Sequence, residues 1–141
     1  MQARGAMLAA LVAALVACQQ APAQLPPPLS LPTNLFGIDW TATEIGGVAV
    51  DPAVPSTLRV EPDQRAFGSG GCNRFSGRAV VEGPNIRLGP LASTRMACLG
   101  PRGEQEERYF VALDLARTYR LQDRRLYLLN AEGAALVVLT R

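Results

Sequence analysis

Hydrophobic and polar residues alternate in short runs through most of the chain after residue 35. In residues 38–43, Ile38, Trp40 and Ala42 fall on one face of an extended chain, and polar residues fall on the other. This two-residue period is typical of a strand with one buried face, which predicts Trp40 in the core. Similar alternation, bounded by Gly, Pro, Asn or Asp, recurs in residues 57–61, 86–88, 119–121, 126–129 and 135–140.

The period changes once, between Glu104 and Arg117. Apolar residues here are spaced three and four apart, at 109, 110, 113 and 116, which predicts an amphipathic helix. Three glutamates, at 104, 106 and 107, are predicted to lie on its exposed first turn, where they complement the helix dipole. The whole pattern predicts a mainly β (α+β) fold: an antiparallel barrel-like roll of about eight strands, with one helix between the fifth and sixth strands.

Glycines at 68, 70, 71 and 77 surround the most unusual stretch of the domain. They favour a strand that bulges and then turns sharply at residues 73–76. Arginine and aromatic residues dominate binding hot spots, so Asn73, Arg74 and Phe75 on such a turn form a candidate partner-binding surface. The rival interpretation is that Phe75 folds back to fill the interior while Arg74 is solvated.

The first 34 residues are predicted to contain a signal peptide followed by a linker that tethers the folded domain to a membrane. Arg4 and an uncharged apolar run of about 12 residues are typical of a secretory signal, and the run is too short to span a bilayer. Because residues 15–18, Leu-Val-Ala-Cys, resemble a bacterial lipobox, we expect a signal peptide over residues 1–17 and lipidation at Cys18. Residues 18–34 then form a proline-rich tether without charged residues, and residues 35–141 form the folded domain. The alternative is an ordinary signal peptide cleaved after Ala23.

The expected cellular location of the protein follows from the same resemblance to a lipobox. Gln19, rather than an aspartate, follows the cysteine, which in Gram-negative lipoproteins implies the outer membrane. We therefore expect a domain anchored to that membrane through the lipid on Cys18, on its periplasmic side.

Export places the chain in an oxidising compartment, and lipidation leaves two cysteines, so we expect a disulfide between Cys72 and Cys98.

Composition argues against several classes of function. The net charge is only +2, with 14 arginines and 12 acids spread along the chain, so a nucleic-acid partner is not expected. Histidine is absent, which removes the commonest general base and zinc ligand. The glycine-rich stretch is followed by a predicted turn rather than a helix, so it does not form a phosphate-binding loop. We expect no catalytic residues, no metal and no cofactor.

Several motifs resemble the META domain, also called the heat-shock protein HslJ family. These are residues 71–73 (Gly-Cys-Asn) with Gly77 behind them, residues 94–98 (Thr-Arg-Met-Ala-Cys), Glu106 and Phe110 in the helix, and residues 126–128 (Leu-Tyr-Leu). The resemblance covers roughly residues 33–140. It implies a small β-rich domain with one helix, found in bacterial envelope lipoproteins. It also implies links to heat shock, novobiocin resistance, motility and secretion, without an established enzymatic activity.

The function expected from these observations is a non-catalytic, outer-membrane-anchored envelope lipoprotein that acts in stress tolerance or surface support. An envelope protein is the expected class of partner. Two alternatives stay open at this point. The domain is a small-molecule or lipid binder that uses the interior of the roll, or it is a protein-binding or inhibitor module.

Overall fold

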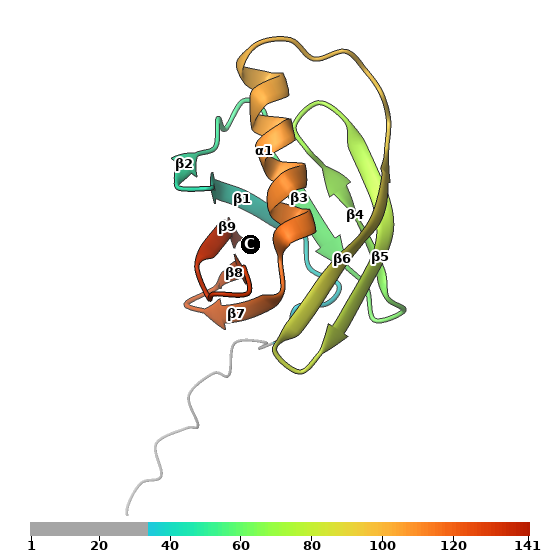
Figure 1. The fold of residues 1–141 in the computed structure, drawn as a ribbon, viewed down its shortest axis with the longest axis vertical. Coiled ribbons are helices and arrows are strands. Elements are labelled where there is room, and N and C mark those ends of the chain that lie inside the picture. The colour runs from blue at the N-terminus through green and yellow to red at the C-terminus, as the bar shows by residue number, and fades with distance from the viewer. Residues whose placement is uncertain (1–33) are drawn as a thin grey trace, which may run out of the picture.

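The computed structural model describes residues 34–141 (Figure 1). They form one antiparallel sheet of nine strands and one helix, α1, at Pro101–Leu115. Because β1 pairs with β9 as well as with its neighbours along the chain, the sheet closes into a ring. The strands are β1 (Trp40–Ile45), β2 (Val48–Ala49), β3 (Thr57–Val60), β4 (Arg65–Ser69), β5 (Arg74–Glu82), β6 (Asn85–Ser93), β7 (Thr118–Gln122), β8 (Arg125–Leu129) and β9 (Ala135–Thr140).

The predicted mainly β, antiparallel architecture with one helix is confirmed, but the predicted position of the helix is wrong. α1 follows the sixth strand, because the structure has a two-residue strand, β2, where the sequence shows no alternating run. Val48 and Ala49 are both exposed and pair with the end of β1 across the turn at Gly46-Gly47. A strand of two exposed residues has no alternation of burial, so the hydrophobic pattern carries no sign of it.

The hairpin β5–β6 is longer than the alternating run at residues 86–88 predicts. Strand β6 continues through Gly89 and Pro90 to Ser93. The register against β5 shifts between Gly77 and Ala79, so two residues of β6 lie opposite one residue of β5. This bulge accommodates the proline, which lacks an N–H for the ladder, without ending the strand.

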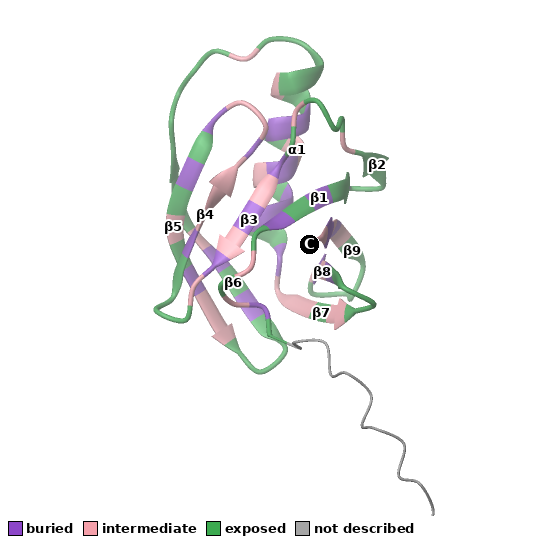
Figure 2. Cartoon of the chain, turned by 180° about the vertical axis from the view of Figure 1, so that it is seen from behind, coloured by how far each residue is buried: buried purple, intermediate pink, exposed green. Residues whose placement is uncertain are grey.

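Inward-facing residues of the strands and one side of α1 form a single core, and buried positions alternate with exposed ones along β1 and β5 (Figure 2). Trp40 is buried, as predicted, and its Nε1–H donates to the carbonyl of Leu35 at 3.1 Å. The largest fully buried side chains include Trp40, Leu58, Ile86, Tyr109, Leu113, Leu126, Leu128 and Leu139. They fill the space enclosed by the ring.

α1 packs on this core through Tyr109, Ala112 and Leu113. The hydroxyl of Tyr109 donates to the carbonyl of Thr57 at 3.0 Å, and burial raises the pKa of this phenol far above its usual value. Within residues 34–141, no helix has the length and apolar content needed to cross a membrane.

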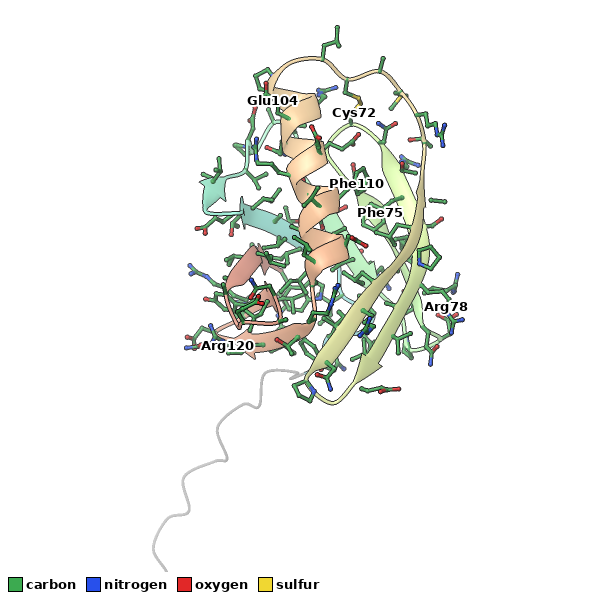
Figure 3. All side chains as sticks on the ribbon, in the orientation of Figure 1. Cys72, Phe75, Arg78, Glu104, Phe110 and Arg120 are labelled. Carbon is green, nitrogen blue, oxygen red and sulfur yellow. A yellow bond between two sulfur atoms is a disulfide. The ribbon has the colours of Figure 1, made fainter. Side chains whose placement is uncertain are left out.

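The predicted sharp turn at residues 73–76 is wrong, and so is the exposed position predicted for Phe75. The chain turns earlier, at residues 71–73, and β5 already begins at Arg74. The ring of Phe75 is only 4% exposed and packs edge-on against Phe110 of α1, with 5.7 Å between centroids (Figure 3). The rival interpretation, in which Phe75 fills the interior and Arg74 is solvated, therefore describes the structure.

Gly68 explains how β3, β4 and β5 approach closely enough to bury this ring. A Cβ atom at Gly68 would collide with the carbonyl oxygen of Thr57 on β3 and would lie 3.0 Å from the Phe75 ring on β5. The glycine is therefore required by close approach of neighbouring strands rather than by a turn.

Candidate functional site

A buried carboxylate, Glu106, joins the helix to the glycine-rich turn. Its Oε2 accepts the backbone N–H of Cys72 at 3.1 Å and also the N–H of Asn73. Its Oε1 accepts the side-chain amide of Asn73 at 2.6 Å. A carboxylate that accepts several N–H groups substitutes for a strand partner at a place where the backbone turns. A Cβ atom at Gly70 would lie 2.7 Å from Oε2, so this approach requires glycine.

Asn73 extends the connection to the segment after β6. Its Oδ1 accepts the hydroxyl of Thr94 at 2.8 Å and the backbone N–H of Met96 at 2.7 Å, and its amide donates to the carbonyl of Met96 at 3.2 Å. The side chain is 5% exposed. We call Glu106, Asn73 and the groups of Cys72, Thr94 and Met96 bonded to them the Glu106 network.

Cys72 and Cys98 add a covalent link between the same two segments. The structure joins them as a disulfide with a Cα–Cα separation of 6.4 Å, within the range for such bonds. The pair predicted from the sequence is thus brought together. Residues 94–100, which we call the strap, are therefore held to the turn by Asn73 at one point and by a disulfide at another.

Gln105, the neighbour of Glu106 on α1, makes a second connection, to the segment between β2 and β3. Its amide donates to the carbonyl of Val54 at 2.7 Å and to the hydroxyl of Ser56 at 3.2 Å, and its Oε1 accepts the N–H of Asp51 at 3.1 Å. The hydroxyl of Ser56 in turn donates to the carbonyl of Gly70 at 2.9 Å. The first half of α1 thus supplies hydrogen-bond partners for two irregular segments, the glycine-rich turn and the segment between β2 and β3.

The prediction that all three glutamates lie exposed on the helix is wrong for Glu106. Glu104 and Glu107 are exposed, but Glu106 is only 8% exposed and faces the turn. Positions 106 and 107 lie about 100° apart around a helix, so neighbouring glutamates can have opposite environments. The sequence offered a usable signal, because Glu106 is one of the residues that carry the family resemblance.

The groups of this cluster bond to one another and so hold the helix, the turn and the strap together. The sulfur atoms of Cys72 and Cys98 and a carboxylate oxygen of Glu106 lie within 4.8 Å of one another, a grouping that could attract a metal ion. The two sulfurs are bonded to each other, however, and the oxygens of Glu106 are engaged by three N–H groups. No residue of the network is left to act as a nucleophile with an oriented base.

A groove outside the ring separates the strap from α1. One hollow of about 600 Å³ is lined by the strap, Asn73 and the first half of the helix, and a second of about 320 Å³ is lined by residues 88–91 of β6 with Asp114. Both hollows are lined by Ser93 and Phe110, so they adjoin, and together we call them the groove. Figure 3 shows Phe110 on the side of α1 that faces β5 and β6. This residue lines both hollows.

Exposed apolar side chains gather along this groove. Leu99 is 90% exposed, Met96 60% and Val111 53%, and all three line it. Large apolar side chains grouped at a groove are typical of a recognition surface, whereas single ones are ordinary. The sequence analysis missed this surface, because it depends on where the strap lies relative to the helix.

Taken together, the fold is a closed antiparallel ring with one helix, reinforced where the helix meets the glycine-rich turn. Residues 33–141 match the META domain family, and the chain belongs to that family, as the motifs predicted. The residues of the Glu106 network and the disulfide are among those that carry the resemblance.

Two solved structures are similar to this chain in fold. The chain is similar to a protein from Burkholderia xenovorans with an NMR structure: identity is 26%, the TM-score is 0.63, and the match covers 87% of this chain and 95% of that one. A second protein with an NMR structure shares the fold, with a TM-score of 0.58 and 23% identity over 72% of this chain and 86% of its own. No curated protein matches the sequence.

Proposed function

We propose that this protein is a non-catalytic lipoprotein of the bacterial cell envelope that binds another envelope protein through the groove between α1 and the strap. In this proposal it is anchored in the outer membrane, with its domain in the periplasm, and contributes to stress tolerance or surface support. The observation that carries the proposal is the groove itself, with Met96, Leu99 and Val111 exposed along it.

The groove is favoured over the interior of the ring as the binding site. Side chains from β1, β3, β8 and β9, among them Trp40, Leu58, Leu128 and Leu139, are at most 1% exposed and pack in one cluster. A ring filled by its own side chains has little room for a ligand. The proposed binding surface is therefore the groove rather than the turn at Asn73, Arg74 and Phe75. Of these residues Asn73 lines the groove, whereas Phe75 lies beneath the surface.

Anchoring depends on Cys18, which lies outside the described residues. The apolar run that ends at Ala17 and the uncharged proline-rich segment that follows support lipidation at this cysteine. We expect metabolic labelling with a fatty-acid analogue to mark the wild-type protein, and Cys18→Ala to abolish the label while the exported domain still folds. Label retained in Cys18→Ala would refute the anchor.

The role of the groove is tested by changing its exposed apolar residues without touching the core. Met96→Asp with Leu99→Asp is expected to remove complementation of a deletion strain under envelope stress, because a partner would have to bury two carboxylates. The matched control is Val48→Asp on β2, which is also an exposed apolar residue (48%) but lies outside the groove. Full complementation by a stable, correctly located Met96→Asp/Leu99→Asp variant would contradict the proposal.

A further inference from the structure

Among the residues that the structure describes, 34–141, strand β6 has a free edge beside the groove. Its pairing with β7 consists of Asn85 opposite Thr118, whereas its pairing with β5 continues to Ser93. Beyond β6, the backbone N–H of Thr94 still donates to Arg74 at 2.9 Å, on the β5 side. Main-chain groups alternate in direction along an antiparallel strand, so those of Leu91 and Ser93 point away from β5.

This free edge lies in the groove wall rather than on open surface. Leu91 and Ser93 line the hollow whose opposite wall is formed by Phe110 and Asp114 of α1. An unpaired strand edge offers main-chain donors and acceptors to any extended chain laid beside it. A partner that adds a strand gains main-chain hydrogen bonds and pockets for alternate side chains at the same time.

The helix wall of the groove is acidic. Glu104, Glu107, Val111 and Asp114 follow one another at spacings of three, four and three, so they share one face of α1. All four are exposed and line the groove. Within residues 34–141 none of these three carboxylates forms an ion pair, and Arg95 on the strap is the one cation among the residues lining the groove.

From this geometry we propose that the groove takes an extended peptide segment with alternating apolar and basic residues, which pairs as an additional strand with the free edge of β6. This inference rests on the proposed function, because it assigns a partner chemistry to the same groove. Apolar residues of the segment contact Phe110 and Met96. Its basic residues meet the carboxylates of Glu107 and Asp114.

Two other occupants fit the groove less well. The chain's own residues 19–34 carry no charge to complement the acidic wall, and their five prolines remove N–H groups that strand pairing needs. A second copy that paired edge to edge through β6 would bring two acidic helix faces toward each other. The charge and the free edge thus favour a basic segment of a different protein.

The test uses the lipidated protein in nonionic detergent micelles and an eight-residue probe of alternating lysine and valine with blocked ends. Binding is followed by NMR of the labelled protein, with the backbone amides of Leu91 and Ser93 as reporters. We expect saturable shifts of both amides. The charge-reversed double variant Glu107→Arg/Asp114→Arg should weaken binding at least tenfold, and Glu132→Arg, an exposed acid on the turn before β9, should leave it unchanged.

Two modified probes separate strand pairing from simple charge attraction. N-methylation of every second residue should weaken binding at least tenfold in the register that removes the donors facing β6, and much less in the other register, if a strand forms. A glutamate-valine probe should bind only to the charge-reversed variant. Equal binding of the methylated and unmethylated probes in both methylation registers would overturn the inference. So would the absence of binding together with concentration-dependent dimers that contact through β6. Failure of the probes with loss of complementation in Met96→Asp/Leu99→Asp would reject the peptide and retain the groove.

Discussion

Glu106→Ala is expected to lower the free energy of unfolding by about 3 kcal/mol. The change leaves three buried or half-buried N–H groups, two from the backbone and one from Asn73, without their acceptor. Each unsatisfied buried donor costs about 1–3 kcal/mol, and water entering from the groove would offset part of that sum. Denaturant unfolding followed by the fluorescence of Trp40, the single tryptophan and a core residue, measures the change directly.

Glu107→Ala is the matched control. It removes a carboxylate from the next position of the same helix, but this side chain is exposed, so a change within about 0.5 kcal/mol is expected. Glu106→Gln keeps the size of the side chain but replaces one acceptor oxygen by an amide, and should fall between the two. A loss below about 1 kcal/mol for Glu106→Ala would show that the network does not support the turn.

Removal of the disulfide, as Cys72→Ala with Cys98→Ala, is expected to cost about 3.5 kcal/mol in the chain-entropy treatment of a loop with this sequence separation of 26 residues. This is a large share of the stability of a small domain, so the melting temperature should fall clearly while the fold is retained through the Glu106 network. Hydrogen exchange should increase most in the strap, which loses its covalent attachment. Alkylation of both thiols in the natively exported protein would contradict the bridge.

Sequence reasoning succeeded where burial follows a simple period. Trp40 and Leu58 lie at alternating positions of strands with one buried face, and both are in the core. Tyr109 and Leu113 recur at helical spacing, and both are buried on α1. The cysteine pair could be predicted because the expected export and the expected lipidation at Cys18 would leave one partner for each remaining thiol, and the structure joins Cys72 to Cys98.

Sequence reasoning failed where long-range contacts decide the environment. The glycines around Cys72 indicated a turn, but its exact place depends on Glu106, which lies 34 residues further along the chain and accepts the N–H groups of Cys72 and Asn73. Phe75 therefore begins a strand and points inward. The groove could not be predicted either, because its walls are two segments whose relative position is set by Asn73 and the disulfide.

The most direct measurement of the central claim is photocrosslinking in intact cells from a photoreactive amino acid placed at Leu99. We expect a discrete covalent adduct from this position in the groove and none from the same amino acid at Val48, the exposed apolar residue on β2. The adduct should disappear in Glu107→Arg/Asp114→Arg, which keeps the fold but reverses the charge of the helix wall. No adduct from Leu99, or the same adducts from Leu99 and Val48 irrespective of that charge reversal, would contradict binding through the groove.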